Sequence, residues 1–138
     1  MAGALGVGGD LTRWSEAELV EAATYVEQYK ALRTTIQTGE QYRLGSPADG
    51  AHAVQYVARD RAESVVLQWR AGPADRAQAP RLRLRGLDPH AGYRVEDDGG
   101  RLPAGTVRSG AALVAHGIPA ELPPRARVSP VLALRRAG

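Results

Sequence analysis

The sequence contains no cysteine, no phenylalanine and only one lysine, Lys30. The absence of cysteine excludes disulfide bonds and thiolate metal sites. Because aromatic residues make up 5% of the chain, a hydrophobic core must be built chiefly from Leu, Val, Ile and Ala. No run approaches the roughly 18 apolar residues of a membrane span, so we expect no membrane partner. The amino-terminal segment lacks the regions of a signal peptide, and we expect a cytoplasmic location.

Length and composition are those of a globular protein with one ordinary domain, or with a small domain and an appended element. Hydrophobic residues make up 43% of the 138 residues and charged residues 24%, which argues against disorder. The net charge of +3 comes from arginines that are mixed with acidic residues, so we interpret it as a solvated surface. A nucleic-acid-binding protein, with steeply salt-dependent binding, is the last-ranked hypothesis because no aromatic residues are interleaved with the arginines.

Residues 14–38 carry the pattern of one long amphipathic helix. Ser15 is followed three positions later by Glu18, the capping-box arrangement that satisfies amides of the first turn. Gly39 is placed to end the helix. Apolar residues recur at the spacing of a helix with one buried face, and these are Leu19, Ala22, Ala23, Val26, Tyr29, Leu32 and Ile36.

From about residue 41 onward, short strand-like runs alternate with Gly, Pro and Asp turns. This pattern predicts a mainly β fold, an antiparallel β-sandwich of the Greek-key type. The clearest period-two run is 81–85, residues 111–115 fit either a strand or a short helix, and 128–134 are the last expected strand. The Pro- and Ala-rich stretch 71–80 is expected to be a hairpin loop or an insertion. Other alternating apolar positions are Val54, Tyr56, Val65, Leu67, Trp69, Tyr93 and Val95.

The apolar face of the long helix is larger than one small β domain is expected to cover. Fully burying a large apolar side chain is worth about 1.5–3 kcal/mol, so this face represents several kcal/mol. We expect part of it to pack on the sheet and the rest to need a partner that this chain does not supply. Self-association through the helix face is therefore also expected.

Several short motifs follow one another in a characteristic order. A glycine-rich segment, 3–11, runs into the helix, which carries Tyr29-Lys30-Ala31-Leu32-Arg33, and 39–44 link the helix to the β region. The order continues through 53–58, 84–89 and 109–118 to 129–132. This succession resembles glycoside hydrolase family 36, chiefly α-galactosidases, over nearly the whole chain.

The resemblance implies two parts. Residues 1–40 would be a remnant of the last βα unit of a (β/α)8 barrel, and 41–138 would be the C-terminal antiparallel β domain. Met1 would then be an internal methionine taken as a start, or the start of a split or truncated gene. The implied partner is the missing catalytic barrel, and a galactoside would bind only in the intact enzyme.

The resemblance also implies where catalysis resides. Retaining glycosidases usually need two carboxylates about 5–5.5 Å apart, and in this family both are aspartates on earlier barrel strands. We therefore expect no catalytic residue in this chain, and no cofactor. Gly8, Gly9 and Asp10 follow a strand at the end where barrel active sites collect, and we assign them to the pocket rim of an intact enzyme. Many family members carry a Glu where Gly8 stands. The competing interpretation of Asp10 is a loop carboxylate that holds the turn before the helix.

Other candidate residues favour structural roles. Asp97-Asp98, an adjacent acidic pair, precedes Gly99-Gly100 and indicates a turn. Gly6-Val7-Gly8 is half of a dinucleotide-binding fingerprint and lacks its third glycine. The three histidines, His52, His90 and His116, have no metal-binding spacing, so no metal site is expected. Trp69, Tyr56 and Tyr93 are of a type that stacks on sugars, but their alternating positions favour a core.

The leading hypothesis is a C-terminal piece of an α-galactosidase, in which the β domain supports the catalytic barrel and is not catalytic alone. The parent reaction would be hydrolysis of terminal α-linked galactose from oligosaccharides. The alternative is a stand-alone carbohydrate-binding β-sandwich, which predicts galactoside affinity without a barrel and an exposed row of aromatic side chains.

Overall fold

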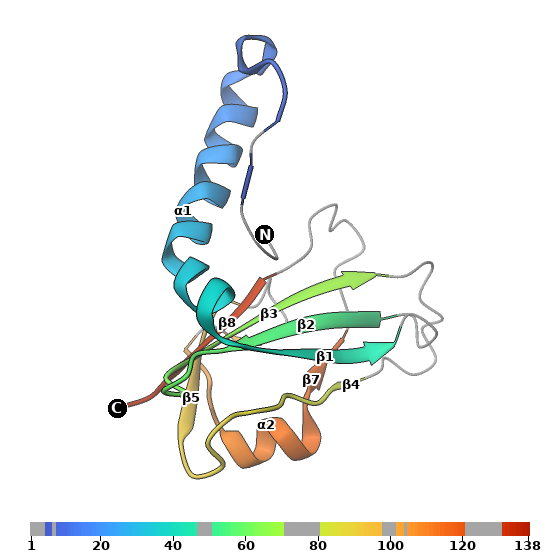
Figure 1. Ribbon diagram of the computed structural model, residues 1–138, viewed down its shortest axis with the longest axis vertical. Coiled ribbons are helices and arrows are strands. Elements are labelled where there is room, and N and C mark those ends of the chain that lie inside the picture. Colours follow the sequence, from blue (N-terminus) through green and yellow to red (C-terminus); the bar gives the residue numbers. More distant parts are fainter. Residues whose placement is uncertain are drawn as a thin grey trace.

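The computed structural model of the protein describes residues 5–6, 8–46, 51–70, 81–97, 102–103, 105–120 and 131–138. The expected mainly β architecture is confirmed: two α-helices accompany a six-stranded antiparallel sheet and a two-stranded one (Figure 1). The expected loop at 71–80 lies outside the described residues. The elements are the 3-10 helix η1 (Leu11–Arg13), α1 (Glu16–Thr38), β1 (Glu40–Ser46), β2 (Ala51–Val57), β3 (Glu63–Arg70), β4 (Arg81–Leu82), β5 (Gly92–Asp97), β6 (Val107–Ser109), α2 (Gly110–His116), β7 (Ile118–Pro119) and β8 (Val131–Arg136).

The larger sheet has the strand order β1-β2-β3-β8-β5-β6. The first three strands form a meander, in which Val54 pairs with Arg43 on one side and Leu67 on the other. The last strand, β8, enters between β3 and β5 and pairs with both. The last expected strand, 128–134, is therefore a strand over its described part, and it lies in the interior of the sheet.

The second layer is much smaller than the first. It consists of β4 and β7, paired through Leu82 and Ile118, together with α2. The period-two run at 81–85 is a strand only at Arg81–Leu82, although Leu82 and Leu84 are buried and the arginines between and beside them are exposed. Buried and exposed side chains do alternate along this run. Beyond Leu82, however, the backbone forms hydrogen bonds with partners other than a neighbouring strand. The ambiguous segment 111–115 forms α2, which is capped by the Ser109 hydroxyl.

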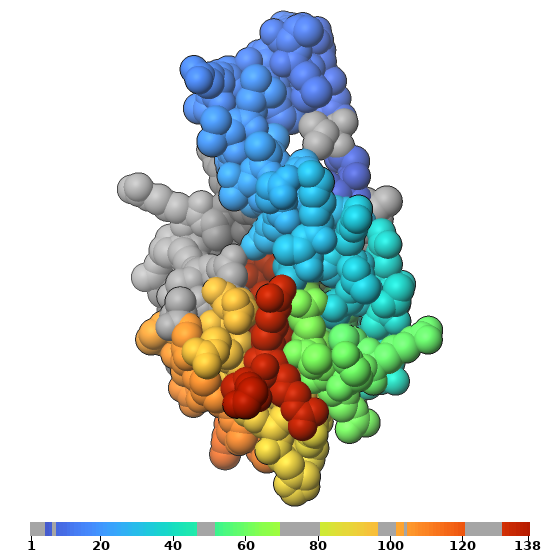
Figure 2. Space-filling view, turned by 90° about the vertical axis from the view of Figure 1, so that its left-hand side faces the viewer, coloured from blue at the N-terminus to red at the C-terminus, as the bar shows by residue number. Residues whose placement is uncertain are grey.

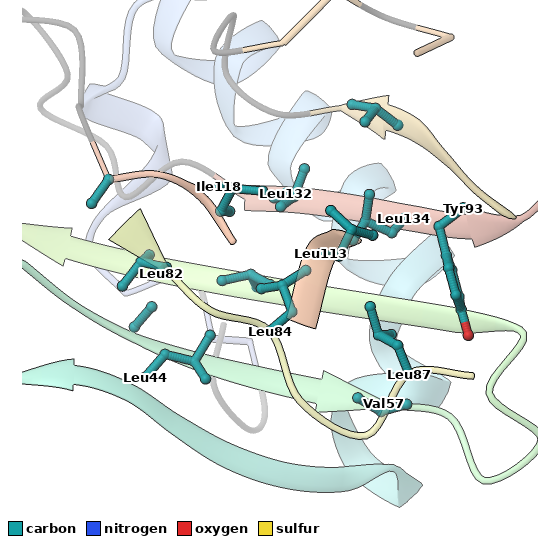
Figure 3. Packing of buried hydrophobic residues seen from close by; sticks show 14 of the residues in the cluster. Leu44, Val57, Leu82, Leu84, Leu87, Tyr93, Leu113, Ile118, Leu132 and Leu134 are labelled. Carbon is teal, nitrogen blue, oxygen red and sulfur yellow. The ribbon is translucent and has the colours of Figure 1, made fainter. Parts of the chain in front are cut away.

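The main core lies between these two layers. Leu82, Leu84 and Leu113 of the small layer point toward Leu132 and Leu134 of β8 (Figure 3). Tyr93, which is fully buried at the edge of this core, donates its hydroxyl proton to the carbonyl of Arg61 and accepts from the amide of Asp88. The core is thus aliphatic, as the composition requires, with one aromatic side chain tied to two turns.

Two buried glutamines cross the main core. Gln55 of β2 donates to the Arg85 carbonyl at 2.9 Å and accepts from the Arg85 amide at 2.8 Å. Gln68 of β3 donates to the carbonyl of Ala120 at 2.6 Å. Both side chains are 0% exposed. The Gln55 amide therefore gives Arg85 two hydrogen bonds of the kind that a neighbouring strand would supply.

The helix α1 covers the opposite face of the larger sheet (Figure 1). Tyr29, Leu32 and Ile36 form a second apolar cluster with residues of β2, β3 and β8, and Leu5 packs at its margin. The sheet thus separates two cores, one closed by α2 and β4-β7 and the other by half of α1.

Candidate functional site

The loop that precedes α1 is the first part of the candidate site. Asp10 caps η1: its carboxylate accepts from the Thr12 amide at 3.1 Å and from the Thr12 hydroxyl at 2.6 Å. These bonds, the hydroxyl first, hold the pKa of the Asp10 carboxyl below its ordinary value. Asp10 therefore does hold the turn before the helix, while its outer face is exposed.

The glycines of this loop have different needs. Gly9 has φ +120°, a conformation that favours glycine, and a Cβ there would meet the indole nitrogen of Trp14 at 3.8 Å. A Cβ at Gly8 would meet nothing within 4 Å. Neither glycine belongs to a strand–helix phosphate loop, because η1 and Trp14 separate them from α1.

The first turn of α1 is closed by the predicted capping box. Ser15 accepts from the Glu18 amide, and the Glu18 carboxylate accepts from the Ser15 amide at 2.7 Å and from its hydroxyl. The hydrogen bond from the Ser15 backbone amide, and then the one from the Ser15 hydroxyl, lower the pKa of the Glu18 carboxyl. This end of the helix is therefore well formed although it stands clear of the sheet.

The exposed half of α1 is the second part of the candidate site. Buried residues are confined to the C-terminal half, whereas Leu19 is 43% exposed and Val20 is 62% exposed. The N-terminal half projects beyond the body of the molecule (Figure 2). The expectation that part of the apolar face lacks a partner within this chain is confirmed among the described residues.

The apolar face of α1 also turns around the helix axis. At about 3.6 residues per turn, Leu19 lies roughly 140° away from Leu32. The expectation of a single buried face was therefore too simple. The sheet covers one side of the helix near its end, and the exposed apolar residues near its start look in another direction.

Other carboxylates in the described part of the chain bond to turns and to neighbouring elements. Glu63 bonds to Thr35 and Arg135, Asp88 bonds to the His90 amide, and Glu40 accepts from the Tyr42 hydroxyl at 2.6 Å. Asp97 ends β5, and its neighbour Asp98 lies outside the described residues. These contacts hold turns and neighbouring elements in place.

The histidines lie apart. His52 stacks on Trp69 with ring centroids 5.9 Å apart, and its Nδ1 is buried without a hydrogen-bond partner. His90 follows a turn at Asp88, and His116 ends α2. Within the described ranges, no three His, Cys, Asp or Glu side chains gather closely enough to hold a metal ion.

The three candidate aromatic residues face inward. Tyr93 is fully buried, Tyr56 is 5% exposed, and Trp69 is half-buried against the second cluster. Burial raises the pKa of Tyr56. The large hydrophobic side chains that are exposed in the described part of the chain are all aliphatic: Leu11, Leu19, Val20, Val107 and Val114.

Sequence reasoning missed the polar groups that tie layers together, Gln55, Gln68 and Thr35. Apolar residues stand on both sides of each glutamine, and this alternation gives no signal that the glutamine itself is buried. Neither helix in the described part combines the length and hydrophobicity that a membrane span requires.

Comparison with known proteins places this geometry in a family. The family model for the glycosyl hydrolase family 36 C-terminal domain matches residues 51–129. Alpha-galactosidase AgaA of Geobacillus stearothermophilus is 36% identical over 97 residues, which are 70% of this chain and 13% of that protein. The chain thus spans about an eighth of the length of this relative.

Solved structures extend the likeness. The crystal structure of GH36 alpha-galactosidase AgaB from the same organism matches with a TM-score of 0.76 and 32% identity, covering 93% of this chain and 17% of that one. The galactosidase domain of the alpha-galactosidase-sucrose kinase AgaSK matches with a TM-score of 0.75 and 28% identity, over 92% and 17%. A β domain of this topology, a matching family model and these relatives lead to one conclusion: the chain belongs to glycosyl hydrolase family 36, of which it carries the C-terminal domain.

Proposed function

We propose that this chain supplies the C-terminal end of an α-galactosidase, with residues 1–40 as the last βα unit of a catalytic barrel and 41–138 as the β domain that steadies it. The observation that carries the proposal is the extent of the structural match. With 93% of 138 residues matched to AgaB, about ten residues are left unmatched. Because α1 alone has 23 residues, much of this helix has a counterpart in a whole α-galactosidase.

The division of α1 into two halves supports this role. The β domain covers Tyr29, Leu32 and Ile36, which fixes the end of the helix on the sheet. The apolar side chains at its start, Leu19 and Val20, are left to the barrel that we propose as the partner. In this arrangement Gly8, Gly9 and Asp10 lie on the loop at the projecting end of α1, and we assign them to the rim of the galactoside pocket.

Catalysis belongs to the whole enzyme in this proposal. Hydrolysis with retention requires a nucleophilic carboxylate and an acid–base carboxylate about 5–5.5 Å apart. The acids whose contacts are described above are engaged in capping, turns and cross-strand bonds. We therefore propose that the chain alone does not hydrolyse α-galactosides, and that galactose-terminated oligosaccharides are substrates of the complete enzyme only. The cytoplasmic location expected from the sequence remains a prediction.

Reconstitution tests the proposal. The chain is mixed with a family 36 α-galactosidase truncated at the start of the matching segment, and cleavage of a chromogenic α-galactoside is followed. We expect no turnover by either piece and recovered turnover by the mixture. The variant Leu19→Arg should prevent recovery, whereas Glu21→Arg, which introduces the same side chain at an exposed position roughly 160° from Leu19 and roughly 100° from Val20 around the helix, should not.

Two outcomes contradict the proposal. Turnover by the purified chain alone would show that it holds its own catalytic groups. A mixture that stays inactive, although the two pieces bind each other in a pull-down, would show that the chain does not complete the enzyme.

Without the barrel, we propose that two copies associate through the same exposed half of α1. Light scattering should report a mass above that of the 14.7 kDa monomer, and Leu19→Arg should return the mass to that value. A monomeric unmodified chain, with Leu19 and Val20 protected neither by a partner nor by the sheet, would contradict this association.

The alternative of a stand-alone carbohydrate-binding module has less support. It requires an exposed aromatic platform, and the exposed large hydrophobic residues in the described part are aliphatic. Calorimetric titration with an α-galactoside separates the two functions, because binding by the isolated chain would favour the module.

A further inference from the structure

The joint between α1 and the sheet contains a polar clasp of three residues: Thr35, Glu63 and Arg135. The Thr35 hydroxyl, near the end of α1, donates a short hydrogen bond to Glu63 Oε1 of β3. The other oxygen of the same carboxylate, Oε2, accepts from Arg135 Nε of β8 at 3.1 Å. One carboxylate therefore connects the helix to two neighbouring strands.

The clasp is largely enclosed on the helix side. Thr35 is 5% exposed, and the side chain of Glu63 is 16% exposed, while Arg135 is half-exposed. Nearby, a Cβ at Gly39 would lie 2.5 Å from the Thr35 carbonyl oxygen and 2.6 Å from that of Val57. The end of the helix is thus pressed onto the end of β2 at the same place.

Apolar packing alone leaves the direction of such a helix loosely defined. Even between two packed helices, the crossing angle within each preferred class scatters by about 15–20°. A charge-assisted hydrogen bond is directional and strongest near its ideal geometry. The Thr35–Glu63 bond can therefore select one angle from the range that Tyr29, Leu32 and Ile36 would accept.

The length of α1 magnifies any change of this angle. Thr35 lies twenty positions after Ser15, which corresponds to about 30 Å of helix. A rotation of roughly five degrees at the clasp would move the start of α1 by about 2–3 Å. The loop of Gly8, Gly9 and Asp10 adjoins that start.

We propose that Glu63 is a positioning residue that sets the angle of α1 on the β domain through Thr35, and thereby places the loop at the helix start. The assignment of that loop to a galactoside pocket rests on the proposed function, but the mechanical role of the clasp does not. Arg135 holds the Glu63 carboxylate in place from the far side.

Pulsed electron paramagnetic resonance between two spin labels measures this angle directly. Because the chain has no cysteine, Val20→Cys on α1 and Val114→Cys on α2 provide two unique labels, both at exposed positions. Labelled protein is diluted with unlabelled protein, so that distances between copies do not contribute. The clasp variants are Thr35→Val and Glu63→Gln, and the control is Thr34→Val, the same change at the exposed neighbouring position.

We expect Thr35→Val to broaden or shift the distance distribution by about 2–3 Å, in keeping with the length of the helix. Glu63→Gln, which keeps an acceptor for Thr35 but loses the charge, should give a smaller change, and Thr34→Val should give none. Circular dichroism verifies that each variant folds. Should Thr35→Val fail to fold, Glu63→Gln decides by the same criterion.

Unchanged distributions in both clasp variants would overturn the proposal, as would an equal change in Thr34→Val. The outcome is independent of the reconstitution experiment. If the unmodified chain fails to restore α-galactosidase activity while Thr35→Val still alters the distance, the proposed function fails and the clasp stands. If the unmodified chain restores activity and the distances do not change, the clasp fails alone.

Discussion

The two faces of the six-stranded sheet are covered in different ways. On the face toward α2, the leucines of the small layer and of β8 are almost fully buried, and two glutamines tie the layers together. On the face toward α1, three large side chains of the helix are buried, while Leu19 and Val20 in the other half of the helix are exposed. The first face thus belongs to a fully enclosed core, whereas the second face holds one end of a helix.

This difference separates what makes the domain fold from what makes it useful. Burial on the α2 side is sufficient to give the β domain its own core. The α1 side uses a smaller cluster to hold one end of a long helix and leaves the other end free. A binding surface is therefore available on the helix at little cost to the stability of the domain beneath it.

The largest expected effect on stability is that of Leu132→Ala, on the face of the sheet toward α2. Leu132 of β8 is 0% exposed, and truncation of a buried Leu to Ala typically costs about 2–5 kcal/mol. Leu19→Ala, with the side chain 43% exposed in the isolated chain, should change the free energy of unfolding by less than about 1 kcal/mol. Urea unfolding followed by circular dichroism measures both. Equal losses in the free energy of unfolding for Leu132→Ala and Leu19→Ala would contradict this difference between the two faces.

A smaller effect is expected from the polar ties of the closed side. Gln55→Leu would leave the Arg85 amide and carbonyl without their partners, and an unsatisfied buried polar group costs about 1–3 kcal/mol. The matched change Gln41→Leu, at an exposed position of the neighbouring strand β1, should have little effect on urea unfolding. A Gln55→Leu variant as stable as the unmodified chain would show that the amide bridge merely accompanies the packing.

The smallest effect concerns the free end of α1. Hydrogen bonds from Ser15 lower the pKa of the Glu18 carboxyl, so its folded form holds the proton less tightly than the unfolded chain does. The stabilisation is therefore present above the ordinary Glu pKa and is lost as the pH falls through the lowered value. Fraying should begin at the start of α1 in acid, with a small loss of helical circular dichroism and faster amide exchange there.

Ser15→Ala provides the control for this pH dependence. The substitution removes the hydroxyl, which accepts from the Glu18 amide and donates to its carboxylate, so the first turn should exchange faster already at neutral pH. The backbone amide of residue 15 still donates to Glu18, so the additional effect of acid should be reduced but not abolished. Acid-induced exchange that spreads evenly over α1 and the sheet would instead indicate global unfolding.

The local elements were the most predictable part of the fold. The capping box at Ser15 and Glu18 and the end of α1 at Gly39 follow from contacts between near neighbours, and all are present. Gly39, however, is required by its close approach to Val57 and not by a left-handed backbone, because its φ is −77°. Spacing alone cannot reveal an approach between segments distant in sequence.

The inner polar ties were not predictable from alternation. Gln55 and Gln68 each stand between apolar residues, which indicates a solvent-facing position in a strand with one buried face. Their partners lie 30 and 52 positions away, so no local pattern marks them. For the same reason nothing in the sequence singles out Thr35, whose partner Glu63 lies 28 positions further on.

The candidate site was predictable only in part. The sequence alone predicted that the apolar face of α1 would exceed what the β domain covers. It did not predict that this face turns around the helix axis, because a count of apolar residues does not show how their direction changes along the helix. Gly8, Gly9 and Asp10 remain assigned to a pocket rim as a prediction, while the turn-holding role of Asp10 is visible in its bonds to Thr12.

The position of β8 has a consequence for how the domain is made. This strand is the last in sequence, yet it is inserted between β3 and β5, which do not pair with each other. Until β8 has been synthesised, the β1-β2-β3 meander and the β5-β6 pair are separate halves of the sheet. Each half then has an unpaired strand edge. Pairing across such a distance in sequence is slow and leaves edges exposed to aggregation. The two halves therefore become one sheet only when the six residues of β8 pair with both of them.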